Sequence, residues 1–543
     1  MMKRSFIGVL IVSSVFTSGG WAAVYSVPGD YPSIQEALNA CVDDDTVAVD
    51  PGTYTENILW PDVQGVTLRS SVAGSPISIR SQGVDRIILQ RTGAERCMVI
   101  LQDLDIAGGV HAPGAGLVFE RTELVMIRCS SRNHRHNGTE AILGLALHCT
   151  ECHLLVENCE FSGNEYEPPT VVYDNLGLAV YLENCTGTFS GCAVRDNTSD
   201  YVLDIVHAPC DVDFIGNRFE NNANVGSDNY RTCLVSGSGS VMIRDNVFSG
   251  NRANSGAVMT AGDLVWVENN LFIGNGGLPA SSAMRPWADM TMIRFNTFSD
   301  NTAFSMGISV GSVCLENNIV MEPMDGDWSV PGRMDYNLFG FADPGSYSFA
   351  YGPSDIFGDP LFVQGPAGTR YLSQTASGQT VKSPCIDAGN PMADVPAGTT
   401  RTDYGPDLGV PDIGYHYPNS GADPACDAPG VTIVMPSNHF EPASTFSTSV
   451  IVCNPLPNPL QGRLYVALAL DGYLGFWPGF TWKLDGYDGE FSSGETEVII
   501  LPAFIWPMNP SGNLGDAMWI GALTDATDQV IGAIDSLSFT FVY

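Results

Sequence analysis

A nine-residue sequence motif, the recurrent phrase, is repeated along the first 340 residues of this 543-residue chain. Two of its copies read Ile243-Arg244-Asp245-Asn246-Val247-Phe248-Ser249-Gly250-Asn251 and Val267-Glu268-Asn269-Asn270-Leu271-Phe272-Ile273-Gly274-Asn275. These two copies begin 24 residues apart, and the weaker copies follow at intervals of about 19 to about 34 residues. Repeat periods of roughly 20–50 residues are typical of stacked repeat folds.

Apolar and polar residues alternate within each copy, which is the period of a β-strand. Glycine, asparagine and aspartate separate the alternating stretches, as turn residues do. Three short strands per repeat, stacked about 4.8 Å apart, make one coil of a parallel β-helix. The sequence therefore predicts an all-β chain built around such a helix.

The recurrent asparagine has a physical explanation. A sharp turn between two strands needs a residue in the left-handed conformation, and asparagine tolerates it best after glycine. In stacked coils each side-chain amide can donate to the one above it. We therefore predict a structural ladder, formed by Asn158, Asn217, Asn246, Asn270, Asn296 and Asn318.

The segment Pro32–Ala40 reads as a short amphipathic helix. Ser33 and Glu36 form a capping box, and Ile34, Ala37 and Leu38 share one face. An open β-helix end exposes unpaired strand edges. We expect this helix to plug the first coil.

These features, with Thr46–Val49, Pro51–Tyr54 and the Asn-x-Phe repeat, resemble the secreted right-handed parallel β-helix proteins of the pectin-lyase-like superfamily. The segments Asp359–Val363, Ser383–Gly389 and Asp412–Tyr417 resemble the tail that closes many such coils. The resemblance covers about residues 24–420. It implies a fold but no single activity, because the superfamily includes lyases, hydrolases, esterases, epimerases and non-catalytic surface proteins.

The sequence predicts four segments. Residues 1–22 read as a signal peptide, with basic Lys3 and Arg4 before a short apolar run. Residues 23–417 form the right-handed β-helix and 418–430 a Pro/Gly-rich linker. Residues 431–543 hold about seven strand-like runs, as in an immunoglobulin-like β-sandwich. We expect a monomer without a membrane span, secreted to the extracellular space or the cell surface.

The chain is strongly acidic, with 24 Lys+Arg against 60 Asp+Glu and a formal charge of −36. Nucleic acids are excluded as partners, because phosphate binding needs a basic surface. An anionic polymer would need Ca²⁺ to bridge the like charges. The expected partner is a polysaccharide or cell-surface glycan, and Ca²⁺ is the candidate cofactor.

Most of the 14 cysteines are interpreted as small buried hydrophobes. Cys426 and Cys453 are disulfide candidates in the C-terminal domain. The run Cys149-Thr150-Glu151-Cys152-His153 matches the C-x-x-C-H pattern of haem c attachment. It is a lone match inside a repeat whose neighbours lack it, so a local disulfide or two packed cysteines fits it better.

In lyase-like β-helices the substrate usually lies along the first sheet. Counting back about 10–15 residues from each ladder position gives the strands of that sheet here. They carry Glu120, Arg121, His148, Tyr181, Asp204, His207, Arg231, Met259 and Arg285. Asp204, His207 and Arg231 fall on adjacent coils and are the catalytic candidates, as base, acid and charge clamp. His148, Tyr181 and Arg285 are binding candidates. The alternative is a set of scattered polar residues on a solvated face.

Three further clusters have two interpretations each. His134 and His136, two residues apart on a strand, read as a metal pair or as an ordinary polar loop. The carboxylates of Asp403, Asp407 and Asp412 are Ca²⁺ candidates, although their spacing matches no defined loop. In the C-terminal domain, two tryptophans read as a sugar-stacking platform or as packing. They are Trp477 and Trp506.

Two functional hypotheses follow. The first is an exported glycan-binding or adhesive protein, because no complete catalytic set is present. The alternative is a polysaccharide lyase or glycoside hydrolase acting in the groove on the first sheet. A lysine base is excluded from the coil before Lys382, because no earlier lysine follows Lys3.

Overall fold

The computed structural model divides the chain into two compact units, one spanning Gly20–Tyr417 and the other holding Pro418–Tyr543. Its described residues are 22–72, 74–81, 97–109, 116–136, 144–166, 179–199, 206–208, 210–224, 232–236, 240–253, 256–260, 262–277, 282–302, 304–308, 312–326, 332–341, 351–403, 405, 407, 409–418, 430–435, 439–440, 445–454, 460–470, 473–478, 483, 486–491, 494–505, 517–524 and 530–541. The predicted signal peptide therefore lies, apart from Ala22, outside the described residues.

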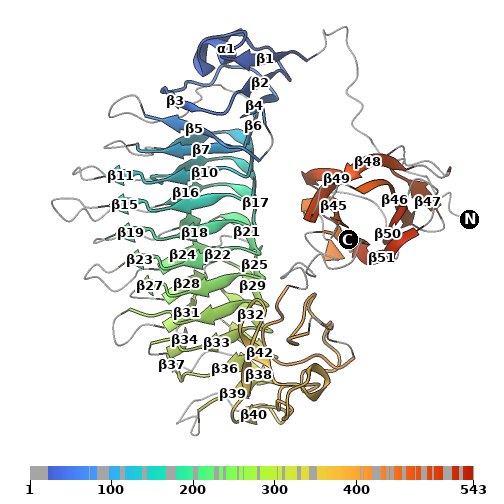
Figure 1. Ribbon diagram of the computed structural model, residues 1–543. Helices are drawn as coiled ribbons and strands as arrows, with labels where there is room; N and C mark the ends of the chain where they lie inside the picture. The colour runs from blue at the N-terminus through green and yellow to red at the C-terminus, as the bar shows by residue number, and fades with distance from the viewer. Residues whose placement is uncertain are drawn as a thin grey trace, which may run out of the picture. The chain divides into compact units, whose positions relative to one another are not determined.

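The first unit is a parallel β-helix, as the sequence predicts (Figure 1). Two of its sheets have thirteen strands each. Sheet A contains β1 (Val24–Val27), β2 (Thr46–Val49), β4 (Val66–Ser70), β6 (Cys97–Gln102), β9 (Thr122–Ile127), β13 (His153–Glu157), β17 (Thr186–Ser190), β21 (Asp211–Ile215), β25 (Ser240–Arg244), β29 (Leu264–Glu268), β32 (Met290–Arg294), β35 (Ser312–Glu316) and β38 (Gly332–Asp335). Sheet B contains β3 (Thr53–Thr55), β5 (Ile77–Arg80), β7 (Leu104–Ala107), β10 (Ser130–Arg132), β14 (Glu160–Ser162), β18 (Ala193–Arg195), β22 (Arg218–Glu220), β26 (Val247–Ser249), β30 (Leu271–Ile273), β33 (Thr297–Ser299), β36 (Ile319–Val320), β39 (Leu338–Phe339) and β40 (Ile356–Phe357).

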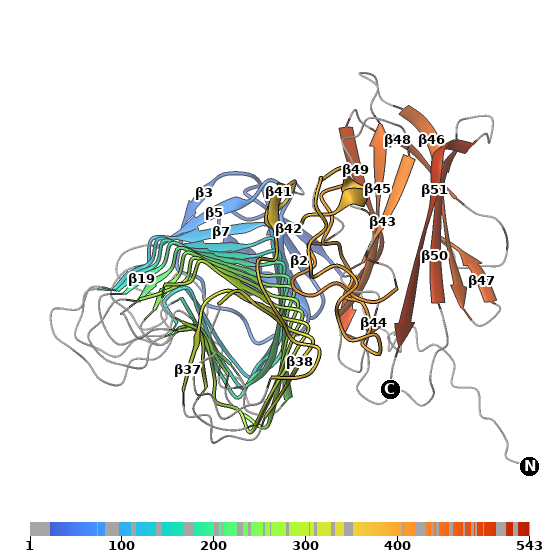
Figure 2. The same cartoon turned by 90° about the horizontal axis from the view of Figure 1, so that it is seen from below.

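Two shorter sheets complete the coils. Sheet C contains β8 (Leu117–Glu120), β12 (Leu147–Thr150), β16 (Val180–Glu183), β20 (Val206–Ala208), β24 (Thr232–Ser236), β28 (Gly256–Thr260), β31 (Ser282–Pro286), β34 (Phe304–Ile308) and β37 (Met324–Gly326). Sheet D contains β11 (Arg135–His136), β15 (Glu165–Tyr166), β19 (Thr198–Ser199), β23 (Ala223–Asn224) and β27 (Arg252–Ala253). Figure 2 looks along the coil, where the strands of each sheet lie over one another.

The alternating sequence explains the core. In β29, Val265 and Val267 are fully buried inside the coil, while Leu264 and Trp266 are half-buried on the outer face. Because parallel strands pair in register, each inward position repeats on the next coil. Phe248, Phe272 and Phe298 stack in this way on sheet B, with ring centroids 4.9 and 4.5 Å apart.

Helix α1 (Ile34–Ala40) plugs the first coil, as predicted, with Ile34, Ala37 and Leu38 fully buried. The Ser33 hydroxyl accepts the N–H of Glu36 at 3.2 Å. Glu56 from the following coil accepts the N–H groups of Ile34 and Gln35, both at 3.1 Å. The helix N-terminus is thus capped partly by the coil that it covers.

The asparagine ladder lies at the turn from sheet A to sheet B. Asn270 Oδ1 accepts the backbone N–H and the side-chain amide of Asn246, each at 2.9 Å. Its own amide donates to Asn296 Oδ1 at 2.9 Å and to the carbonyl of Ile243 at 2.8 Å. The same pattern runs through Asn217, Asn246, Asn270, Asn296, Asn318 and Asn337, and ends on Asp355.

The left-handed residue of this turn is not the ladder asparagine but the residue before it. Asp245, Asn269 and Phe295 have φ of 59°, 51° and 57°. The prediction that Asn158 is a ladder rung is therefore wrong. Asn158 has φ of 52° and is exposed, and the next residue, Cys159, takes the ladder position. A phenylalanine lies two residues after five of the six asparagine rungs, with Val320 after Asn318, and Phe161 in the same way marks Cys159 as a rung.

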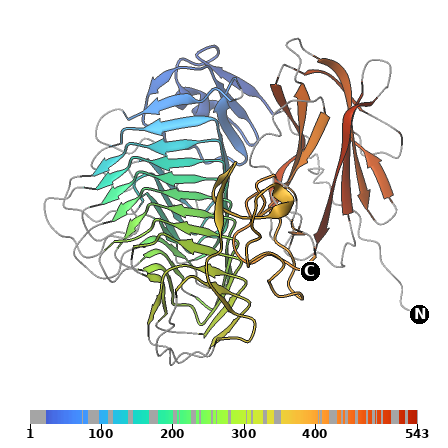
Figure 3. The same ribbon diagram turned by 60° about the horizontal axis from the view of Figure 1, so that its bottom comes forward.

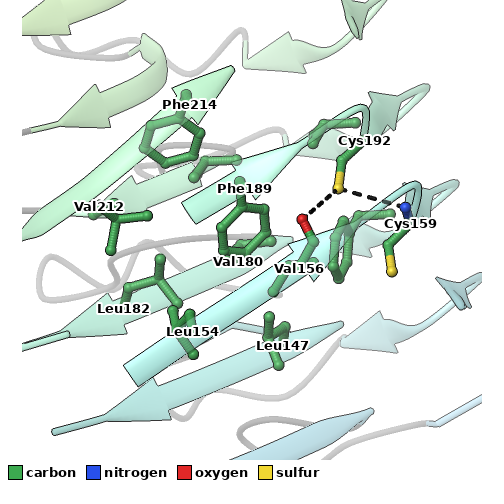
Figure 4. Close-up of a cluster of buried hydrophobic side chains, with 14 of the residues drawn as sticks. Leu147, Leu154, Val156, Cys159, Val180, Leu182, Phe189, Cys192, Val212 and Phe214 are labelled. Atoms are coloured by element: carbon green, nitrogen blue, oxygen red, sulfur yellow. Dashed lines mark hydrogen bonds between the residues drawn. The ribbon is translucent and has the colours of Figure 1, made fainter. Parts of the chain in front are cut away.

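Cysteines replace asparagine as rungs in the upper coils (Figure 4). Cys159 Sγ accepts the N–H of Cys129 at 3.4 Å and lies 3.2 Å from the carbonyl of Glu157. Cys192 Sγ accepts the N–H of Cys159 at 3.4 Å, and its own N–H donates to Asn217 Oδ1 at 2.9 Å. Thiol and amide therefore serve the same backbone groups.

A second ladder, which the sequence analysis did not assign, lies where sheet B meets sheet D. Asn197 Oδ1 accepts the amide of Asn164 at 2.8 Å, and the contact repeats down the coil. Its rungs are Asn164, Asn197, Asn222, Asn251, Asn275 and Asn301. Four of them end the recurrent phrase itself, at Asn164, Asn251, Asn275 and Asn301.

The tail that follows β40 packs on the outer face of sheet B at the lower coils (Figure 3). It contains β41 (Phe362–Gly365), β42 (Gly368–Leu372) and the short helix η1 (Thr375–Ser377). Tyr371 and Tyr417 stack with ring centroids 3.9 Å apart over Leu271. The His416 N–H donates to Asn269 Oδ1 at 2.6 Å, so the tail is fixed directly to a left-handed turn residue.

The second unit is an antiparallel β-sandwich (Figure 2). Its core surrounds the fully buried Trp519. Strand β51 pairs antiparallel with β50 and in parallel with β43, and so joins the two layers. Its strands are β43 (Gly430–Val434), β44 (His439–Phe440), β45 (Thr445–Asn454), β46 (Leu460–Leu470), β47 (Tyr473–Phe476), β48 (Tyr487–Phe491), β49 (Gly494–Ile505), β50 (Ala517–Thr524) and β51 (Val530–Phe541).

An ion-pair cluster lies on the outer face of sheet B in the upper coils. Asp105, only 7% exposed, accepts from Arg132 at 2.6 and 2.9 Å, from Ser130 at 2.8 Å and from Arg80 at 3.0 Å. Burial alone raises the pKa of Asp105, but these hydrogen bonds and charges outweigh it and lower the pKa to about 2.

We predict that Asn270→Ala lowers the free energy of unfolding by about 3 kcal/mol, because it leaves buried N–H and carbonyl groups without partners. Asn158→Gly is the matched control, since it removes an exposed amide at a left-handed position and should change stability by less than about 1 kcal/mol. Urea denaturation followed by circular dichroism measures both. Equal losses would contradict the ladder register.

We predict that Asp105→Asn costs about 1–2 kcal/mol at pH 7 and little at pH 2, after allowance for solvent screening of the half-exposed arginines. The folded-state pKa lies below the unfolded value, so the stabilisation is present above about pH 4 and disappears as the pH falls towards about 2. Urea midpoints measured across this range test it. Glu123→Gln, an exposed carboxylate on sheet A, is the control, and a pH-independent loss for Asp105→Asn would contradict the prediction.

Candidate functional site

Sheet C is the sheet on which the sequence analysis placed the substrate. Its register puts His148 beside Tyr181, and Tyr181 beside His207. The same line continues through Val235 and Met259 to Arg285. The predicted residues His148, Tyr181, His207, Met259 and Arg285 thus share one register line across six adjacent strands.

The upper part of this line is defined by side chains. Leu147, Cys149, Val180 and Leu182 point into the core and are fully buried, so the alternating residues face outward. The rings of His148 and Tyr181 meet edge to face with centroids 5.3 Å apart. His148 Nε2 also lies 3.3 Å from Thr150 Oγ1. These contacts fix the orientation of both rings.

Tyr181 sits in a protected position on this outer face, with 7% of its surface exposed. Burial, together with the nearby carboxylate of Glu183, raises the pKa of its phenol. At neutral pH the side chain is therefore an uncharged hydrogen-bonding aromatic group, which is a typical contact for a sugar ring.

A second outward line, which sequence reasoning largely missed, runs two residues further along each strand. Thr150 pairs in register with Glu120 on one side and with Glu183 on the other. Arg121 follows β8 in the left-handed conformation and bonds Glu120 at 3.0 Å. Period-two spacing from His148 and Tyr181 would have identified Thr150 and Glu183.

The proposed catalytic group is described only in part. Asp204 and Arg231 lie outside the described residues. His207 is placed by its backbone on β20, between Tyr181 and Val235. The catalytic roles of Asp204, His207 and Arg231 stay predictions.

At the lower end of the line, Arg285 is half-buried on β31. Its guanidinium lies beside Gly307 of β34. A Cβ atom on that glycine would lie 3.5 Å from Arg285 Nε. A cation is thus held on the same outer face as the aromatic residues.

The two histidines proposed as a metal pair do not share a strand, because His134 precedes β11 and His136 ends it. Burial and the charge of Arg80 lower the pKa of His134 to about 3, so its ring is neutral. His134 Nδ1 accepts the Gly109 N–H at 3.1 Å, and Nε2 lies 3.0 Å from Ser131 Oγ. His136 stacks on Tyr166 with centroids 5.7 Å apart. Both ring nitrogens of His134 are therefore used within the protein.

The three aspartates proposed for Ca²⁺ lie in the tail. Asp403 bonds Arg401 at 2.6 and 2.8 Å, which holds its pKa well below the usual range. Asp407 accepts from His416 Nε2 at 2.8 Å. Asp412 accepts from Thr400 Oγ1 at 2.5 Å, and burial beside Asp407 raises its pKa.

Within the described ranges, no group of three or more His, Cys, Asp or Glu side chains is arranged to hold a metal ion. The carboxylates of Asp403, Asp407 and Asp412 are instead engaged by donors of the protein.

Trp477 in the sandwich is partly buried against the core around Trp519. Its ring lies 5.6 Å from that of Tyr487, which is 44% exposed. Trp506 lies outside the described residues. The core contact therefore explains the buried part of the Trp477 side chain. The exposed ring of Tyr487 beside it leaves an aromatic group on the surface.

Residues 157–326, less than a third of the chain, match the model of the family described as NosD, periplasmic copper-binding protein. No curated protein matches the chain.

Solved structures of polysaccharide lyase family 6 resemble it distantly. A mutant of the alginate lyase AlyGC has 14% identity and a TM-score of 0.32, covering 69% of this chain and 60% of the lyase. A mannuronic acid-specific lyase from human gut microbiota has 14% identity and a TM-score of 0.27, covering 61% of this chain and 89% of that one. The Pseudopedobacter saltans lyase Pedsa3628 has 12% identity and a TM-score of 0.22, covering 62% and 92%. At these scores the likeness carries no argument about substrate or activity.

Proposed function

We propose that the chain is an exported β-helix protein that binds an extended glycan along the outer face of sheet C. The observation that carries this proposal is the register line of His148, Tyr181, His207, Met259 and Arg285 on adjacent strands. Strands about 4.8 Å apart repeat one position in a straight row, which suits a linear polymer better than a compact ligand.

The chemistry of the row suits sugars. The half-buried imidazole of His148 offers hydrogen bonds to ring hydroxyls, and Tyr181, only 7% exposed, orients that ring by an edge-to-face contact. Glu120, Thr150 and Glu183 add acceptors and a hydroxyl on the next outward line. A formal charge of −36 favours a neutral glycan, or an anionic one bridged by Ca²⁺.

Export is supported by the signal-like residues 1–22 and by the periplasmic family that matches part of the coil. In the part of the chain that the structure describes, no helix has the length and apolar character needed to cross a membrane. The final location, extracellular or at the cell surface, belongs to the proposal.

We predict that His148→Ala and Tyr181→Ala each weaken glycan binding about tenfold or more, because the first removes a glycan contact and the second removes the ring that orients it. The purified chain is run through gels containing neutral or uronate polysaccharides, with Ca²⁺ or with EDTA. Retardation measures affinity, and loss of retardation in EDTA would assign a bridging role to Ca²⁺.

His153→Ala is the matched control, because His153 is also a half-buried outward histidine, but on β13 of sheet A. It should bind as the unchanged chain does. Equal weakening by His153→Ala, or retention by no polysaccharide, would overturn the proposal.

The same samples distinguish the enzymatic alternative. Appearance of unsaturated products or new reducing ends would show a lyase or a hydrolase. Loss of that activity in His207→Ala would then support the catalytic prediction for this residue.

A further inference from the structure

Seven buried cysteines gather in the coils around the candidate site. Cys129, Cys159 and Cys192 are rungs at the turn from sheet A to sheet B. The other four occupy the turn from sheet C to sheet A and the strand before it. They are Cys149, Cys152, Cys185 and Cys210, each no more than 2% exposed.

All four thiols of this second group are free in the structure, and that of Cys152 lies between two others. The Cys152 thiol is within hydrogen-bonding reach of those of Cys149 and Cys185. Cys152 Sγ also lies 3.4 Å from the carbonyl of Thr150, and Cys185 Sγ lies 3.4 Å from that of Glu183. Contact with Cys149 and Cys185 lowers the pKa of Cys152, whereas burial raises that of Cys149.

Cys152 therefore has two possible disulfide partners, Cys149 and Cys185. The geometry of the two pairs differs. Cys152 and Cys185 occupy equivalent positions on stacked coils, where parallel strands hold their Cβ atoms about 4.8 Å apart. A disulfide needs a Cβ separation of about 3.5–4.5 Å, so this pair requires a backbone shift.

Cys149 and Cys152 lie instead on the two sides of one corner. Cys149 is an inward residue of β12, and Cys152 precedes β13 after the left-handed Glu151. Both side chains are directed into the same interior, from two sheets that meet at this corner. The separation of this pair is therefore not fixed at one strand spacing.

We propose that Cys149 and Cys152 form a disulfide across the β12–β13 corner when the exported chain folds. The oxidant is a protein disulfide donor of the exporting compartment. The Cys152 thiolate attacks one donor sulfur and releases the other as a thiolate. The Cys149 thiolate then attacks the Cys152 sulfur, which breaks the mixed disulfide. The two protein thiols lose two protons and two electrons, and the donor disulfide takes these up to become a dithiol.

The bond would hold the strand that carries the candidate site. His148 precedes Cys149 directly, and Thr150 follows it. His148 belongs to the row proposed for the glycan, and Thr150 belongs to the outward line beside it. A covalent corner therefore limits fraying of β12 from the coil without changing the outward face.

The sequence offers an unambiguous test. Cleavage after glutamate cuts at Glu140, Glu151 and Glu157, and so separates peptides 141–151 and 152–157, each with one cysteine. The full chain, exported by its expression host, is denatured, alkylated without reduction, digested and analysed by mass spectrometry. We expect the two peptides to be found joined and to separate on reduction.

Recovery of both peptides as alkylated thiols would overturn the proposal. Joining of peptide 152–157 to peptide 184–220, which carries Cys185, would overturn it equally. In Cys149→Ser we expect Cys152 to be alkylated. The control Cys159→Ser, a rung at the other corner, should keep the joined pair.

Discussion

The hydrogen bonding of backbone groups at the buried corners is the constraint on which the β-helix depends. Strand pairing provides hydrogen-bond partners for the backbone groups within the sheets. Each sharp turn, however, leaves buried N–H and carbonyl groups without a partner on a neighbouring strand. The side chain after the left-handed residue supplies those partners. Asn270 does so for Asn246 above it and for the carbonyl of Ile243. An unsatisfied pair on every coil would cost more than one coil's packing provides.

Because the rung has to offer a donor and an acceptor of small size, chemically different residues occupy it. Cys159 and Cys192 replace asparagine in the upper coils, and His134 accepts and donates at the top of the second ladder. The weaker thiol bonds are accompanied by apolar neighbours such as Phe189 and Phe214, whose rings stack 5.6 Å apart.

The fold was predictable because residue type repeats with two periods. Apolar residues recur every two residues within a strand, and the whole motif recurs about every 25 residues, once per coil. The ladder register was only partly predictable. In Asn269-Asn270 both residues suit either position, and only the phenylalanine two residues after the rung decides. The site was predictable as a row on sheet C, because outward positions repeat in register. The tail contacts were not predictable, since His416 binds Asn269 across 147 residues of chain.

A regular coil also restricts what kind of ligand it can bind. Each outward position recurs at one strand spacing, so functional side chains form lines rather than a closed pocket. On sheet B the tail covers the outer face at Leu271, and in the upper coils Arg80 and Arg132 are engaged by Asp105. On sheet C the outward line presents the rings of His148 and Tyr181, which meet edge to face with centroids 5.3 Å apart. Because this line crosses adjacent strands at one spacing, it fits the repeating units of an extended glycan better than a compact ligand.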